Sequence, residues 1–107
     1  MNWTSAKGTI ILLLLSLAAC TSKPDPEEQG ALMLREARSL YASGQLSAAR
    51  DTILSLRQRF PMAIEARKSA ILLLDSIELQ DAAGDTLKEE FYRRKLAFDL
   101  KELSIKN

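Results

Sequence analysis

The chain has 107 residues, of which 47% are hydrophobic and 6% aromatic, and its formal net charge is +1. This length holds one small domain. The absence of His and the single Cys exclude an internal disulfide, the usual Cys/His zinc sites and His-based catalysis. The near-zero charge argues against nucleic acid as a partner, because phosphate binding needs a clustered positive surplus.

The first 20 residues place a basic residue, Lys7, before an apolar run over 10–17. These are the parts of a secretory signal. The run is shorter than the ~20 residues that a membrane-spanning helix needs. We therefore expect residues 1–19 to be a signal peptide that is cleaved from the chain.

The apolar run ends in Leu17-Ala18-Ala19-Cys20, which resembles the lipobox of bacterial lipoproteins. The resemblance implies cleavage between Ala19 and Cys20, a diacylglycerol on the Cys20 thiol and an acyl chain on its new amino group. Thr21 rather than Asp then implies the outer membrane, on its periplasmic side or at the cell surface. The alternative is an ordinary signal peptide followed by an incidental or buried Cys.

Residues 20–30 contain two prolines, a glycine and several charged residues, and cannot build a core. We expect a flexible tether that starts at the lipidated Cys20 and reaches about 30 Å when extended. A helical domain should follow over 31–107.

Two amphipathic helices are predicted over 31–43 and 46–60. Their apolar residues recur at steps of three and four, Gly44 separates them, and Pro61 ends the second. The small residues Ala37 and Ala49 should let the two helices approach closely.

The hairpin resembles the tetratricopeptide repeat (TPR), a helix-turn-helix unit of 34 residues. The matching positions are Ala37 and Leu40 in the first helix, Gly44 in the turn, Ala49 and Ile53 in the second helix, and Pro61 at its end. The amino-acid sequence around these positions is similar to that of TPR lipoproteins of bacterial outer membranes. Met33 and Glu36 depart from the family pattern, which usually has Trp and Leu there.

Two longer helices are predicted after the hairpin, one from about 66 to 83 and one from 85 to about 105, with Gly84 as the break and Asp85 as the cap. The expected fold is therefore all-α: a TPR-like αα-hairpin followed by two longer helices, after a signal peptide and tether. A stacked array normally needs about three repeats, so no long peptide groove is expected.

The last predicted helix has two apolar sides. One side consists of Leu87, Phe91, Phe98 and Ile105. The other consists of Tyr92, Leu96, Leu100 and Leu103. We expect the first side, which holds both Phe residues, to face the core and the second to bind a partner. The alternative is that the preceding helix covers one side and the hairpin the other.

The charged residues predict no catalytic site. The pairs Glu27-Glu28 and Glu89-Glu90 point in different directions on a helix, and no phosphate loop, nucleophile motif or metal-ligand spacing is present. We expect no cofactor besides the covalent lipid and no small-molecule substrate. The basic run 93–95 should pair with Glu89 and Glu90; binding of anionic lipid headgroups is the alternative.

These observations predict a membrane-anchored lipoprotein that acts as a non-catalytic protein-protein interaction or scaffold module of the bacterial cell envelope. The partner would be another protein or a second copy of the chain, bound through the last helix. A different class is a structural envelope lipoprotein that self-associates through a coiled-coil-like last helix. A third and weaker candidate is a small envelope hydrolase.

Overall fold

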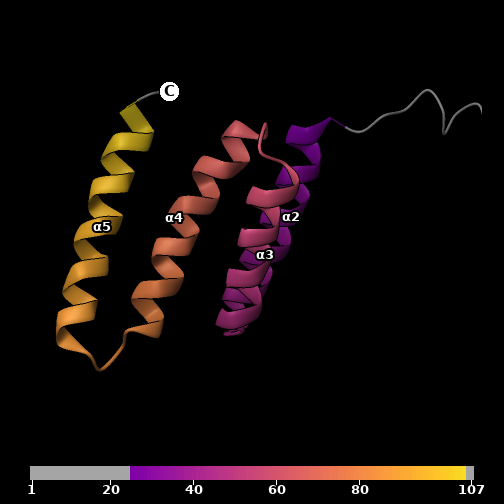
Figure 1. The fold of residues 1–107 in the computed structure, drawn as a ribbon. Coiled ribbons are helices and arrows are strands. Elements are labelled where there is room, and N and C mark those ends of the chain that lie inside the picture. Colours follow the sequence, from indigo (N-terminus) through magenta and orange to yellow (C-terminus); the bar gives the residue numbers. More distant parts are fainter. Residues whose placement is uncertain (1–24, 106–107) are drawn as a thin grey trace, which may run out of the picture.

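The computed structural model describes residues 25–105, with side chains up to Leu103, and these residues form four helices and no strand. The helices run up and down, with α4 between α5 and the pair formed by α2 and α3 (Figure 1). The prediction of an all-α fold is confirmed. Cys20, the cleavage site and the signal peptide over 1–19 lie outside the described residues.

Helix α2 (Pro26–Ala42) begins earlier than predicted. The expected tether over 20–30 is therefore wrong from residue 26 onwards. Pro26 stands at the first helical position, where no backbone N–H is needed for a hydrogen bond within the helix. The negative charges of Glu27 and Glu28 in the first turn interact favourably with the helix dipole. Pro26, which the sequence pattern assigned to an extended tether, is instead the first residue of a helix.

Helix α2 ends in a tight turn at Gly44, whose φ of 81° suits a residue without a Cβ. The N–H groups of Gly44 and Gln45 donate to the carbonyls of Tyr41 and Leu40, which is a Schellman motif. Helix α3 (Leu46–Arg59) returns beside α2 and ends before Pro61. The predicted two-helix hairpin is confirmed.

Helix α4 (Ile64–Asp81) lacks a side-chain cap from its own N-cap residue, Ala63. The carboxylate of Glu27 on α2 takes that role: its Oε1 and Oε2 accept from the backbone N–H groups of Glu65 and Ala66, at 3.1 and 2.9 Å. A contact between residues almost forty positions apart thus satisfies free donors at the start of α4 and fixes α2 against it.

Helix α5 (Thr86–Ile105) follows a turn at Gly84, whose φ is 94°. The side chain of Asp85 accepts from the backbone N–H of Lys88 at 3.2 Å, as expected for an N-cap. The sequence placed both the break and the cap correctly.

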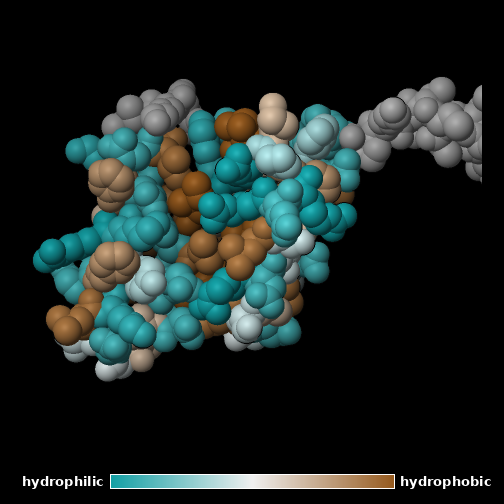
Figure 2. All heavy atoms as spheres, viewed as in Figure 1, coloured by the Kyte–Doolittle hydropathy of each residue, from teal (hydrophilic) through white to brown (hydrophobic). Residues whose placement is uncertain are grey.

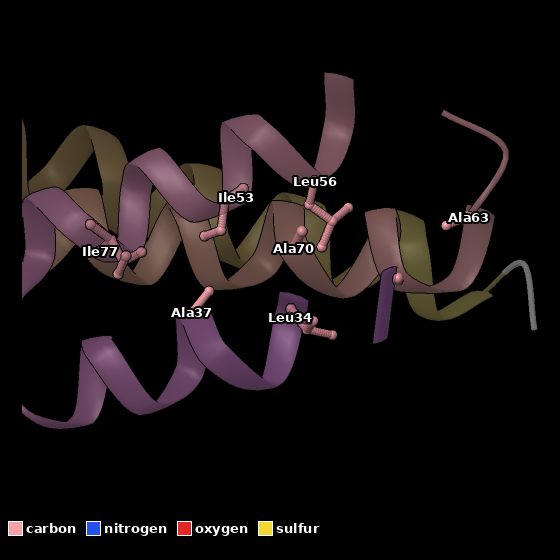
Figure 3. Close-up of a cluster of buried hydrophobic side chains, with 9 residues drawn as sticks. Leu34, Ala37, Ile53, Leu56, Ala63, Ala70 and Ile77 are labelled. Atoms are coloured by element: carbon pink, nitrogen blue, oxygen red, sulfur yellow. The ribbon is translucent and has the colours of Figure 1, made fainter. Parts of the chain in front are cut away.

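The core lies among α2, α3 and α4 and is built from small and aliphatic side chains (Figure 3). Its buried members are Leu34, Ala37, Ala49, Ile53, Leu56, Ala63, Ala66, Ala70 and Ile77. Ala37 and Ala49 are fully buried, which confirms the predicted close contact within the hairpin. Gly30 is also buried, and a Cβ on it would lie only 2.8 Å from that of Ala63, so α2 and α4 approach closely there.

Helix α5 stands outside this core. It packs along α4 and makes no comparable contact with α2 or α3, and from 86 to 103 none of its residues is fully buried. The alternative arrangement is thus right for the preceding helix, since α4 covers one side of α5, and wrong for the hairpin, because α4 keeps α5 apart from α2 and α3. One side of α5 has no cover within the described chain.

Candidate interaction surface on the last helix

The side of α5 that packs on α4 is the one predicted to bind a partner. Tyr92, Leu96 and Leu103 are half-buried, as is the acidic residue Asp99 on the same side. Leu100, at the edge of this side, remains 47% exposed. The expectation that these four apolar residues form one exposed surface is wrong, because Tyr92, Leu96 and Leu103 pack on α4.

The opposite side of α5 faces away from α4. Leu87 is 85% exposed, Phe91 59% and Phe98 62%, and apolar side chains stand along this outer edge (Figure 2). We call Leu87, Phe91, Arg94 and Phe98 the outer face of α5. Its apolar members were expected in the core, so that prediction is wrong. The side chain of Ile105, assigned to the same side, lies outside the described residues.

Ion pairs within α5 hold the charges beside the outer face. Glu90 accepts from Arg94 at 2.8 Å and from Arg93 at 3.0 Å, and these two guanidinium groups lower the pKa of Glu90. Arg93 also lies 3.9 Å from Glu89. The predicted pairs of Glu89 with Arg93 and Glu90 with Arg94 are confirmed. The basic run 93–95 is thus largely neutralised by acidic neighbours, which weakens the case for a lipid-headgroup site.

A buried carboxylate decides which side of α5 faces α4. Asp75 on α4 is 2% exposed, and its Oδ1 accepts from Lys95 Nζ at 2.8 Å. Lys95 also donates to Asp99 at 2.8 Å, so the ammonium bridges the two carboxylates. Because these contacts need Lys95 and Asp99 near α4, they turn Leu87 and Phe98 outward.

The second oxygen of Asp75, Oδ2, is buried without a hydrogen-bond partner. Burial raises the pKa of Asp75 to about 6; the neighbouring Asp99 adds to the rise and Lys95 opposes it. The neighbouring Asp75 and the Lys95 ammonium group lower the pKa of Asp99.

A groove of about 260 Å³ runs between α3 and α5, with α4 as its floor, and apolar side chains gather in a band between these helices (Figure 2). It is lined by Arg50, Leu54, Leu74, Asp75, Glu78, Tyr92 and Lys95. Its cations are already paired, Lys95 with Asp75 and Arg50 with Glu78, whose Oε1 accepts from Arg50 Nε at 2.6 Å. The groove therefore offers a ligand few uncommitted charges.

Sequence reasoning missed the Asp75–Lys95–Asp99 cluster and the role of Glu27. A signal existed for Asp75, because a carboxylate directly after the apolar run 70–74 must find a partner when that helix is buried. None existed for Glu27, since only the packing of α2 on α4 brings it to the backbone of residue 65.

Comparisons of the chain with protein-family models, with curated proteins and with solved structures find no match. None of the helices described between residues 25 and 105 is both long and apolar enough to cross a membrane. Within the same residues, no group of three or more acidic or Cys side chains is placed to hold a metal ion.

Proposed function

We propose that this chain is a lipoprotein of the bacterial outer membrane, anchored through Cys20, that acts as a non-catalytic protein-protein interaction module. The lipobox order Leu17-Ala18-Ala19-Cys20 supports the anchor. The TPR-like spacing of Ala37, Gly44 and Ala49 supports a helical binding scaffold on that anchor.

The outer face of α5 is the observation that carries the interaction role. It places two Phe side chains and a Leu, each more than half exposed, on one side of a helix that, among the helices described, packs against α4 only. Contiguous exposed apolar residues that include aromatic side chains are typical of protein-binding surfaces. Arg94 in their midst suits such a surface, because Arg and aromatic residues are enriched at interface hot spots.

The packing of α4 also supports a repeat-like scaffold. Helix α4 contacts both helices of the hairpin, as the first helix of a following repeat would do. Helix α5 packs on α4 in turn, and its other side is uncovered among residues 25–105, which is where a stacked array would continue or bind.

The lipid anchor is tested on the full chain by intact-mass analysis after expression in a bacterium with lipoprotein-processing enzymes. We expect a chain that starts at Cys20 and carries the added mass of a diacylglycerol and an acyl chain. A mature chain that starts elsewhere, or a Cys20→Ala variant that is still cleaved and membrane-bound, would contradict it.

The interaction surface is tested in the same cells by photo-crosslinking. Replacing Phe98 with p-benzoylphenylalanine keeps an aromatic side chain on the outer face, and the same residue at the exposed position Arg38 on α2 is the control. We expect a discrete crosslinked product from position 98 and none from position 38. No product from 98, or equal products from both, would count against an interaction role for this face.

A further inference from the structure

We propose that the outer face of α5 binds the same face of a second copy of this chain, with the two helices antiparallel. This inference rests on the proposed function, because it names the partner of that same surface. The side chains of this contact are not those of the binding surface expected from the sequence. The charged residues of the outer face and beside it specify the relative direction of the two helices.

The spacing along the outer face is that of a coiled-coil seam. Its residues lie at alternating steps of four and three along the helix, so the pattern repeats every seven residues. Lys101 continues the same row after Leu87, Phe91, Arg94 and Phe98. The ring of Phe91 also makes an edge-to-face contact with that of Tyr92, with centroids 5.0 Å apart. A second helix is therefore the shape that fits this row.

The two cations in the row favour the antiparallel direction. A parallel pair would place Arg94 against Arg94 and Lys101 against Lys101, which are like charges within the seam. An antiparallel pair centred on residue 96 instead places Arg94 beside Phe98 of the second copy, and Lys101 beside its Phe91. Both become cation–aromatic contacts. Glu90, already bonded to Arg94, keeps that guanidinium compensated as water is excluded.

The flanking positions agree with the same arrangement. With the pair centred on residue 96, Lys88 lies on the same flank of the seam as Glu102 of the second copy and about 3 Å from it along the axis. Both side chains are exposed in the single chain. Ala97 meets its own copy near the centre, where a small side chain allows close approach. Lys95 also lies near its copy, but Asp75 and Asp99 balance its charge.

The pair should be weak in dilute solution. One face of one helix is small against the ~1,600 Å² that a stable complex typically buries. Two copies anchored in one membrane would meet at a much higher effective concentration. The test therefore uses the full chain in membranes or at high concentration in mild detergent.

Charge exchange across the pair tests the direction. Lys88→Glu and Glu102→Lys should each weaken the dimer about tenfold by sedimentation equilibrium, whereas the double variant should recover most of the loss. Rescue within one chain is excluded, because the two positions are about 21 Å apart along a helix. Single variants that associate like the unchanged protein, or a double variant that is no better than either single, would overturn the proposal.

A crosslinking measurement keeps the proposal testable without relying on the charge variants. With p-benzoylphenylalanine at position 88, we expect crosslinks by mass spectrometry to residues 101–105 of a second copy. Crosslinks to 85–92 of a second copy would indicate a parallel pair and overturn the proposal. A product at position 98 that contains a different protein would also overturn it, yet leave the interaction role standing. No product at position 98 would contradict both.

Discussion

Lys95 on α5 donates to Asp75 on α4 with an Nζ–Oδ1 distance of 2.8 Å, across a boundary where Tyr92, Leu96 and Leu103 are half-buried. This contact joins the one helix that stands outside the core to the helix that lies within it. Asp75 is nearly inaccessible, whereas the Lys95 side chain is 43% exposed. The carboxylate therefore bears most of the desolvation, which is why the pKa of Asp75 rises.

The stability of the domain should depend on pH through Asp75. Its pKa is about 6 in the folded chain and near 3.8 for the free group, so the folded state holds a proton that the unfolded state has lost between those values. The contribution of protonated Asp75 to the free energy of unfolding is fully present below pH 3.8 and is lost as pH rises through 6. We expect the urea concentration at the unfolding midpoint to decrease as the pH is raised from 4.5 to 7.5. The chain has no His to obscure this window.

Asp75→Asn is the matched variant for this pH dependence, because its amide has the same shape and does not titrate. It should flatten the change between pH 4.5 and 7.5. Asp99 acts in the opposite sense and in another window, since its lowered pKa makes its contribution disappear only below about pH 4. An unchanged slope in Asp75→Asn would show that another group is responsible.

Replacing Glu27 with Ala should destabilise the domain by about 1 kcal/mol, as loss of an N-cap typically does. The reason is that the N–H groups of Glu65 and Ala66 lose their acceptor on α2. Thermal unfolding measures the change. Glu28→Ala is the control, because Glu28 lies in the same first turn but is exposed; an equal loss there would mean that helix-dipole effects, not capping, dominate.

Gly30→Ala should destabilise the domain by about 1 to 3 kcal/mol through overpacking, although Ala is the better helix former by about 1 kcal/mol. The added Cβ would lie 2.8 Å from Ala63 Cβ and 3.1 Å from Ala66 Cβ, and neither can turn away by changing rotamer. Chemical denaturation measures the loss. The double variant with Ala63→Gly removes the shorter contact and should recover part of the stability; a stabilised Gly30→Ala variant would show that α4 shifts freely.

Ala49→Leu should overpack the contact between α2 and α3 and lower stability by about 1 to 3 kcal/mol. Ala49 is fully buried within the hairpin, whereas Ser47, two residues earlier on α3, is exposed. Ser47→Ala should therefore leave the thermal midpoint nearly unchanged. Similar midpoints for the two variants would show that the hairpin tolerates a wider separation than its small residues imply.

The helices and their breaks could be predicted from the sequence because their causes are local. Gly44 and Gly84 adopt positive φ, Pro61 cannot continue a helix, and Asp85 bonds to a backbone group three residues away. The alanines that bring the hairpin helices together were also visible in the apolar period. The lipid anchor at Cys20 stays a prediction from sequence, outside the described residues.

The orientation of α5 was decided only by the tertiary structure. Apolar periodicity shows which residues share a side of a helix, but α5 has two such sides, and periodicity does not tell which one another helix will cover. That choice follows from Lys95 meeting Asp75 twenty positions away, as the capping of α4 follows from Glu27 meeting Ala66. Contacts between helices depend on how the chain packs in space, and that packing left Phe91 and Phe98 at the surface.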